Sequence, residues 1–149
     1  MTLTCAANRL ELPATLEQLP LFLNHIRQAA QAAGLMAGRV LHLELAAEEA
    51  LVNICNHAYS ASNAVGMAVC QVTLTATALR VELIDSGAAY NPLARPDPDT
   101  ALSLEQRIPG GLGVLMLKQL SDAVYYRREY EQNVLTIEMQ RMVDAQEEG

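Results

Sequence analysis

The longest regular pattern in the chain is a run of apolar and small residues at positions 41–59, LHLELAAEEALVNICNHAY. Its length suits a helix of about five turns. Within the run, Glu49, Asn53 and His57 recur every four residues, so a helix places all three on one face. Because burying a charge or an amide without a partner is costly, this polar row needs something to satisfy it. We therefore expect a central helix that carries a polar site.

Two elements are expected ahead of this helix. Residues 3–12 alternate, with interruptions, between apolar and polar side chains and predict a first strand. From Thr15, which begins a capping-box sequence, apolar residues recur every three or four positions until Gly34, a common helix stop. This pattern predicts a helix from Thr15 to Gly34, and residues 36–39 are expected to link it to the central helix.

Two strand patterns follow the central helix. Residues 67–78 alternate as a half-buried strand does, and a tight connection leads to a second alternating segment at residues 79–85. Strands joined so closely are expected to pair antiparallel. In the second strand Val81, Leu83 and Asp85 share one face, so the carboxylate of Asp85 is expected to point inward at the strand end.

A long irregular segment separates these strands from the next helix. Residues 92–109 hold four of the six prolines and little periodicity, which is typical of a lid, a binding segment or disorder. Glycines at 110, 111 and 113 then precede a helical pattern over residues 114–124. Such glycines let backbone N–H groups bind an anion at the helix start, although they more often serve only as caps or allow close packing.

The chain is expected to end in a hairpin and a tail. Residues 123–130 and 133–141 alternate as two strands that turn around Glu131 and Gln132. Residues 142–149, which end in the acidic sequence DAQEEG, are expected to form a frayed tail.

Composition narrows the kind of protein. With 149 residues the chain fits one domain that is large enough for a real core. Hydrophobic residues make up 51% of it, but five are Tyr, one is Phe and none is Trp, so the core must be aliphatic. The net charge of −7 and the single Lys argue against a nucleic-acid binder, since phosphate recognition by such proteins relies on a clustered basic surface.

The cysteines and the N-terminus indicate the compartment. Cys5, Cys55 and Cys70 are odd in number and lack the spacing of metal ligands, so we interpret them as small apolar residues in a reducing environment. No apolar run is long enough to cross a bilayer, and the first residues lack a basic start followed by an apolar segment. A cytoplasmic protein without membrane contact is expected.

Two places in these elements can carry chemistry. Glu49 and Asn53 offer the oxygen ligands and the base that a magnesium nucleotide needs nearby, although the same pair is common on the solvated face of an ordinary helix. Asp85 can accept a hydrogen bond from the exocyclic amine of a base such as adenine, and Gly87 lets the backbone come close to the ring. The alternative is that Asp85 simply opens a turn.

Taken in order, these motifs resemble the GHKL ATPase superfamily, and within it the anti-sigma-factor serine/threonine kinases. The similarity extends over nearly the whole chain through EEALVNICNHAY, VELIDSGAAYNP, PLARPDPD, RIPGGLGVLMLKQLSD and VYYRREYEQNVLTI. The resemblance implies one domain over residues 1–149, with residues 92–109 as an ATP lid. It also implies an α+β two-layer sandwich in which a mixed, mostly antiparallel sheet of about five strands carries helices on one face.

The resemblance also implies roles for individual residues. Asn53 matches the asparagine that ligates magnesium, Glu49 matches the base toward the substrate hydroxyl, and His57 falls beside the phosphates. Asp85 and Gly87 match the adenine-reading pair. The other implied nucleotide contacts are Tyr90 and Asn91 at the pocket wall, Arg107 in the lid, and Gly111, Leu112 and Gly113 in the phosphate-binding loop.

The function that the resemblance implies is a protein kinase that uses ATP and Mg2+. Its substrate is a serine or threonine on a small anti-anti-sigma (STAS-type) partner, it holds a sigma factor inactive when ATP is bound, and its relatives commonly form homodimers. Relatives often have a Gly-Thr pair that contacts phosphate where this chain has Gln132 and Asn133. Glu48 is an alternative base, but it is rotated about 100° from Glu49 on the helix, so Glu49 is favoured.

Three other interpretations fit part of the sequence. The first is a nucleotide-dependent binding module that sequesters a regulator without transferring phosphate. The second is the detached ATP-binding domain of a histidine kinase, which needs a phosphorylatable histidine on a helical hairpin; neither His25 nor His42 lies in such a context. The third is an interaction domain that binds no nucleotide.

Overall fold

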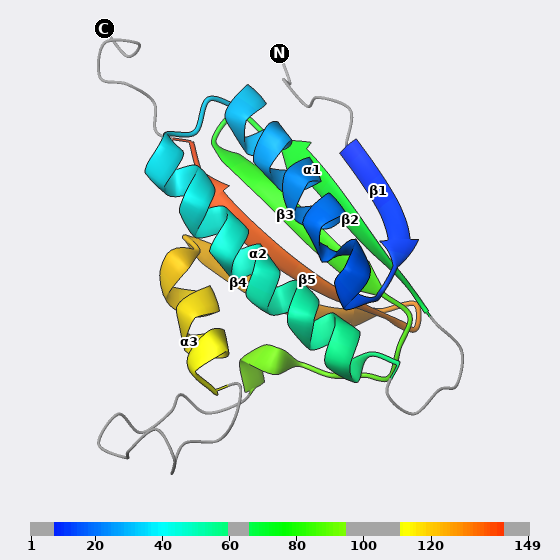
Figure 1. The fold of residues 1–149 in the computed structure, drawn as a ribbon. Helices are drawn as coiled ribbons and strands as arrows, with labels where there is room; N and C mark the ends of the chain where they lie inside the picture. Colours follow the sequence, from blue (N-terminus) through cyan, green and yellow to red (C-terminus); the bar gives the residue numbers. More distant parts are fainter. Residues whose placement is uncertain (1–7, 60–65, 95–110, 142–149) are drawn as a thin grey trace, which may run out of the picture.

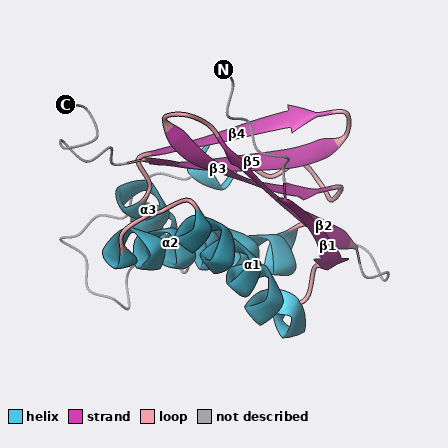
Figure 2. Cartoon of the chain, turned by 90° about the horizontal axis from the view of Figure 1, so that it is seen from above, coloured by secondary structure: helices cyan, strands magenta, loops and turns pink. Residues whose placement is uncertain are grey.

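A sheet of five strands forms one layer, and three helices lie on one of its faces (Figures 1 and 2). The computed structural model describes residues 8–59, 66–94 and 111–141. The strands are β1 (Asn8–Pro13), β2 (Met67–Leu74), β3 (Ala78–Asp85), β4 (Ala123–Glu129) and β5 (Gln132–Gln140). The helices are α1 (Leu19–Ala32), α2 (Ala37–His57) and α3 (Gly111–Leu120), with short 3-10 turns η1 (Leu16–Gln18) and η2 (Pro92–Ala94).

The strand order is β1-β2-β3-β5-β4, and each neighbouring pair is antiparallel. This confirms the expected two-layer α+β sandwich, although the described strands include no parallel pair. The register pairs Asp85 of β3 with Ala68 of β2 on one side and with Asn133 of β5 on the other. Two residues that are 48 positions apart therefore meet at one end of the sheet.

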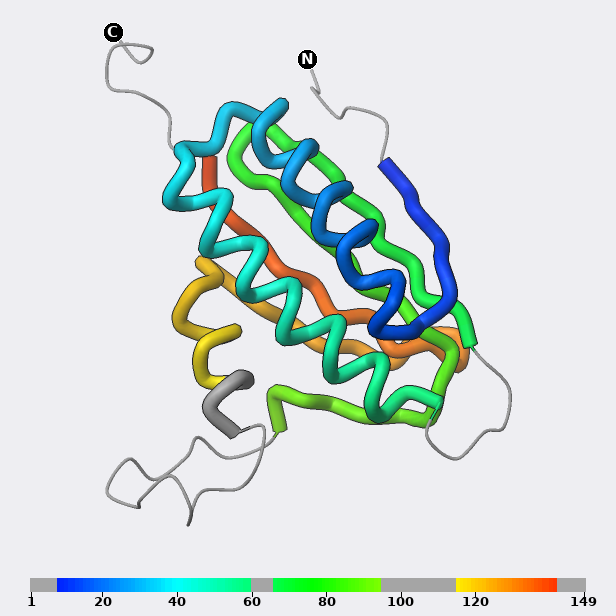
Figure 3. Tube along the Cα trace, viewed as in Figure 1, coloured from blue at the N-terminus to red at the C-terminus, as the bar shows by residue number. Residues whose placement is uncertain are grey.

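The core lies between the sheet and the helices. Figure 3 shows α2 crossing the middle of the sheet between α1 and α3. The largest fully buried side chains are Phe22, Ile26, Leu43, Leu51, Leu79, Leu83, Leu117, Ile137 and Met139. Apart from the single phenylalanine this list is aliphatic or thioether, as the composition predicts. The alanines at 46, 47 and 50 are also buried, which lets α2 pack closely against its neighbours.

The central helix begins earlier and ends earlier than expected. It starts at Ala37, so the prediction of a link over residues 36–39 is wrong. The extended backbone of Met36 precedes the helix, and its carbonyl accepts the first helical bond from Val40 N at 2.9 Å. Arg39, in the first turn, donates to the carbonyl of Gln140 at 3.0 Å and forms an ion pair with Asp122. These contacts hold the helix start against the end of β5.

The first helix also differs at its start. The expected capping box does not form, because the side chain of Thr15 makes no capping bond and its backbone carbonyl instead accepts from Gln18 N at 3.0 Å. That bond creates the turn η1, and α1 follows with Pro20 near its start, where a missing N–H costs little. Gly34 has a φ of 85°, the left-handed conformation that ends helices, as expected.

Three other boundaries shift for local reasons. β2 ends at Leu74 because the hydroxyl of Thr75 accepts the N–H of Ala78 at 3.0 Å and closes the turn. The last hairpin turns at Tyr130 and Glu131, whose φ values of 50° and 62° fit a type I′ turn, one residue before the expected position. α3 spans Gly111–Leu120 rather than 114–124.

Residues 3–7 of the expected first strand, most of the lid and the expected tail lie outside the described residues.

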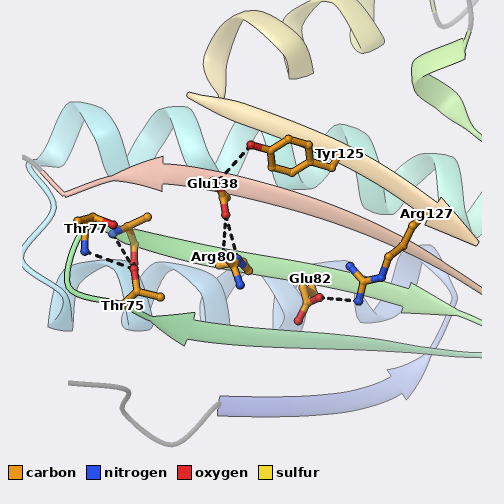
Figure 4. Close-up of polar contacts among 8 residues, drawn as sticks. Thr75, Thr77, Arg80, Glu82, Tyr125, Arg127 and Glu138 are labelled. Carbon is orange, nitrogen blue, oxygen red and sulfur yellow. Dashed lines mark hydrogen bonds and ion pairs between the residues drawn. The ribbon is translucent and has the colours of Figure 1, made fainter. Parts of the chain in front are cut away.

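The face of the sheet away from the helices is polar. Arg80 pairs with Glu138 at 2.9 Å and Arg127 with Glu82 at 3.2 Å, while the hydroxyl of Tyr125 donates to Glu138 at 3.4 Å (Figure 4). Because side chains alternate along a strand, Tyr125 lies on this outer face and its neighbour Tyr126 lies on the helix side. Exposed ion pairs of this kind add little to stability.

The two described cysteines are free thiols, and Cys55 is partly buried. Cys70 is fully buried, and this burial raises the pKa of its thiol to about 12. Cys5 lies outside the described residues. Among the described helices, none combines the length and the apolar composition that crossing a membrane requires.

The packing of α1 on the sheet leads to a stability test. Phe22 is 1% exposed and its neighbour Leu21 is 54% exposed. We expect Phe22→Ala to lower the free energy of unfolding by about 3–5 kcal/mol, because it removes the largest core side chain of α1. Denaturant unfolding of this variant beside Leu21→Ala measures the difference. A loss of similar size in both variants would contradict this placement of the core.

Candidate functional site

One pocket lies where the C-terminal half of α2 meets the sheet at the ends of β3 and β5. Its polar lining comes from Asn53, Asp85, Tyr90, Tyr126 and Asn133. The cavity measures about 20 Å3, enough for roughly one water molecule. Three residues that the sequence indicated, Asn53, Asp85 and Tyr90, therefore share one pocket. It also contains Tyr126, which the sequence did not indicate, and Asn133, which the resemblance had placed at a phosphate contact.

Asp85 lies at the end of β3 and faces the helices, as expected, with 4% of its surface exposed. Its Oδ1 accepts hydrogen bonds from the backbone N–H of Gly87 and from Nδ2 of Asn133, both at 2.9 Å. Among the described residues, the hydrogen bonds to this carboxylate all end on Oδ1. Oδ2 is therefore the oxygen that can accept from a ligand in the pocket.

Gly87 brings the loop after β3 against the end of α2. The N–H of Ala88 donates to the carbonyl of Ala58 at 3.0 Å. A Cβ on Gly87 would lie 1.9 Å from that same carbonyl oxygen, so no side chain fits there. The sequence suggested that this glycine makes room for a purine ring, whereas the close neighbour in the structure is the helix end. Arg128 adds a bond from Nη1 to the carbonyl of Gly87 at 2.8 Å.

Glu49 and Asn53 contact one another on α2, as their spacing predicts. Nδ2 of Asn53 donates to the backbone carbonyl of Glu49 at 3.0 Å and to Oε1 of its carboxylate at 3.4 Å. With the amide nitrogen engaged, Oδ1 is the atom that Asn53 can offer to a cation. Glu49 is half buried, while the alternative base Glu48 is exposed.

The environment of Glu49 changes its acidity. Burial removes water from the carboxylate and raises its pKa above the ordinary value of 4.5. The bond from Asn53 opposes this shift, and the charge of neighbouring Glu48 adds to it. A carboxylate with a raised pKa binds a proton more readily, which suits a general base.

The row on α2 continues to His57, whose ring stacks on that of Tyr90 with centroids 4.9 Å apart and planes at 28°. This contact joins the end of α2 to the loop after β3. Asn91 is exposed, and its Oδ1 accepts the N–H of Leu93 at 2.9 Å, which opens the turn η2. Tyr90 is thus part of the pocket wall, while the Asn91 side chain makes a local turn contact.

The expected phosphate-binding residues are described only in part. Gly111, Leu112 and Gly113 form the first turn of α3, so the helix begins among the glycines and not after them. α3 packs alongside α2 and runs in the opposite direction, which places its first turn toward the C-terminal half of α2 (Figure 1). The first N–H groups of a helix have no intrahelical partner and can bind an anion. Arg107 lies outside the described residues.

Asn133 is the main site residue whose place the sequence did not reveal. The resemblance suggested a changed phosphate contact at this position, but the structure places Asn133 opposite Asp85 in the pocket. The hydroxyl of Tyr126 donates to its Oδ1 at 2.5 Å. The order of β3 and β5 in the sheet creates this contact, and the sequence pattern alone does not give that order.

The protein oxygens in this region suit a metal ion that is coordinated mainly by phosphate oxygens and water. In the part of the chain that the structure describes, no three His, Cys, Asp or Glu side chains gather to hold a metal. One amide oxygen from Asn53, beside the Glu49 carboxylate, matches the way Mg2+ is held by one or two side chains together with phosphate oxygens and water.

The five-stranded sheet with helices on one face defines the protein as an α+β two-layer sandwich. The chain belongs to the histidine kinase-like ATPase domain family, whose model matches residues 12–139. It is 37% identical over 97 residues to the serine/threonine-protein kinase BtrW of Bordetella bronchiseptica, a match over 64% of this chain and 66% of the relative. The chain thus spans just under two thirds of that relative.

A solved structure shows the same fold. It contains the RsbU and RsbW domains of Rv1364c from Mycobacterium tuberculosis and superposes with a TM-score of 0.65 at 16% sequence identity. The match covers 93% of this chain and 34% of that chain. At this identity the likeness concerns the fold alone.

The contact between Gly87 and α2 can be tested by adding one methyl group. We expect Gly87→Ala to lower the free energy of unfolding by about 1–3 kcal/mol, because the new Cβ forces the loop away from Ala58. Gly38→Ala is the matched control, since a Cβ there meets nothing within 4 Å and alanine favours a helix. Thermal unfolding compares the two; a Gly87→Ala protein as stable as the wild type would show that the loop does not pack as described.

Proposed function

We propose that this chain is an ATP-dependent serine/threonine protein kinase and anti-sigma factor, built as one nucleotide-binding domain over residues 1–149. The observation that carries the proposal is the pocket itself. Asn53 from α2 and Asp85 from β3 line it together, and Glu49 contacts Asn53. Membership of a kinase-like ATPase family and the 37% identity to a serine/threonine kinase support the same function.

The purine of ATP lies against Asp85 in this proposal. The exocyclic amine of adenine donates to the carboxylate, and the apolar side chains around the pocket pack on the ring. Because the cavity holds about one water molecule, its walls must move apart when the base enters. Tyr90 lies in the loop after β3, so its side chain can move aside while its backbone N–H stays bonded to Asn133.

The phosphates lie toward α2 and the first turn of α3. A bound Mg2+ would neutralise charge on the phosphates, and Oδ1 of Asn53 is the protein atom suited to hold it. Free N–H groups at the start of α3 bind phosphate oxygens, with His57 beside them. The family resemblance adds Arg107, from the lid at residues 92–109, as a contact to the γ-phosphate.

Glu49 acts as the base in the transfer step. It accepts the proton of a serine or threonine hydroxyl as the hydroxyl oxygen forms its bond to the γ-phosphorus. The bond between that phosphorus and the bridging oxygen of ADP breaks at the same time, and ADP leaves. Positioning and charge neutralisation supply most of the rate enhancement in such reactions.

The partners follow from the family resemblance. The acceptor is a serine or threonine of a small STAS-type anti-anti-sigma protein, and the ATP-bound domain sequesters a sigma factor. The serine/threonine kinase name of the Bordetella relative supports the acceptor type. A binding module that sequesters a regulator without phosphotransfer is the alternative, and the kinase assay below separates the two.

Glu49 and Glu48 form a matched pair for testing the base. We expect Glu49→Gln to slow phosphate transfer to a cognate STAS-type partner by about 10²–10⁴-fold, because the amide cannot accept the proton. Binding of Mg-ATP should stay within a few-fold of the wild type. Phosphate incorporation into the partner measures transfer, and Glu48→Gln should transfer normally. Equal transfer by wild type and Glu49→Gln would refute the assigned base, and ATP binding without any transfer by the wild type would favour the binding module.

Asp85 can be tested by calorimetry with Mg-ATP. We expect the wild type to bind and Asp85→Ala to lose at least about tenfold in affinity, because the buried acceptor for the adenine amine is removed. The exposed Asp122→Ala serves as the control for loss of a carboxylate, since Asp122 contacts Arg39 and Gln140 and does not line the pocket. Undiminished binding by Asp85→Ala would remove this residue from the site.

A further inference from the structure

We propose that Asn133 is a positioning residue for nucleotide recognition: its amide fixes one carboxylate oxygen of Asp85, so that the other oxygen selects a 6-amino purine over a 6-oxo purine. This inference rests on the proposed function, because it concerns the base of the nucleotide that the pocket binds. It assigns a role to Asn133, which lines the pocket beside Asp85.

The side-chain amide of Asn133 is fully engaged. It is 5% exposed, and its Nδ2 donates to Oδ1 of Asp85 at 2.9 Å and to the carbonyl of Ala88 at 2.8 Å. Its Oδ1 accepts from the backbone N–H of Tyr90 at 3.2 Å and from the hydroxyl of Tyr126 at 2.5 Å. A primary amide has two N–H donors and two oxygen lone pairs, so all four positions are used.

These four partners also fix the direction of the amide. Both groups at Nδ2 are acceptors that carry no hydrogen, and the backbone N–H at Oδ1 can only donate. Turning the amide over would place its oxygen against Asp85 and Ala88 and its hydrogens against an N–H group. Asn133 therefore always presents an N–H to Asp85.

The fixed amide decides what Asp85 can offer to a ligand. Oδ1 receives two N–H groups, from Gly87 and Asn133, and this holds the carboxylate plane in one orientation. The remaining oxygen, Oδ2, accepts a hydrogen bond from a ligand and donates none. Adenine carries an exocyclic amine at C6, whereas hypoxanthine carries a carbonyl oxygen there. The fixed oxygen pairs with the C6 amine of adenine but faces the C6 carbonyl of hypoxanthine. The carboxylate would have to turn to reach the neighbouring N1–H of hypoxanthine, and the bonds to Oδ1 oppose that turn, so the buried oxygen discriminates between the two bases.

Binding of Mg-ATP and of Mg-ITP, measured by calorimetry, tests this role. We expect Asn133→Leu, which is similar in size but has no polar atom, to weaken ATP binding about 10–100-fold while ITP binding changes little. The preference for ATP over ITP should therefore collapse. Asn133→Thr returns one hydroxyl donor and should recover part of the preference. A general loosening of the pocket would instead lower the affinities for ATP and ITP by the same factor, so the ratio of the two affinities would not change.

A second variant avoids the risk that Asn133→Leu does not fold. Tyr126→Phe removes only the hydroxyl that holds Oδ1 of Asn133, and we expect a smaller loss of ATP preference, about threefold to tenfold. Tyr125→Phe is the same chemical change one residue earlier, on the outer face of the sheet (Figure 4), and should leave both affinities unchanged.

The outcomes separate this inference from the proposed function. No binding of ATP by the folded wild type would overturn the proposed function and the inference with it. If the wild type prefers ATP and folded Asn133→Leu keeps the same ratio, the role of Asn133 is wrong while the nucleotide site stands. If Asn133→Leu does not fold, an unchanged ratio in Tyr126→Phe overturns the inference.

Discussion

The contact between the end of α2 and the loop after β3 brings the two halves of the site together. The hydrophobic core packs α2 against β3 and β5, and at the end that carries the polar groups the loop after β3 also packs on the helix. The bond from Ala88 N to Ala58 O at 3.0 Å holds the backbones together, and Gly87 provides the space. The hydroxyl of Tyr59, just after α2, makes a second contact with the sheet. It accepts a hydrogen bond from Ser86 N at 2.9 Å and donates one to Met67 O at 2.7 Å. These contacts hold the end of α2 beside the loop that follows Asp85.

The site is a set of buried polar groups that satisfy one another in part. Asn53, Asp85 and Asn133 are all buried, and each would be costly in an apolar core without partners. Asn133 uses all of its hydrogen-bonding capacity within the protein, whereas Asp85 and Asn53 each keep an oxygen for a ligand. Glu49, which contacts Asn53, is partly buried as well, and this burial raises the pKa of its carboxyl. Under the proposed function, the region gives up some stability for groups that can bind the nucleotide.

The sequence predicted the elements well because their patterns are local. The spacing of Glu49 and Asn53 and the alternation that turns Asp85 inward depend only on helix and strand periodicity, and both are found as expected. The predicted ends of helices and strands were less accurate, since each end depends on one or two individual hydrogen bonds. The hydroxyl of Thr75 ends β2, and the backbone carbonyl of Thr15 replaces the expected side-chain cap. The contact between Asn133 and Asp85 could not be predicted, because it requires knowing that β5 lies beside β3 in the sheet.

The central claim is that one pocket between α2 and the sheet binds the purine of a magnesium nucleotide. A crystal structure of the protein with Mg2+ and a non-hydrolysable ATP analogue tests it most directly. The claim requires the C6 amine of adenine within hydrogen-bonding distance of Oδ2 of Asp85, and Oδ1 of Asn53 on the cation. A nucleotide bound elsewhere, with this cavity still at about 20 Å3, would contradict it.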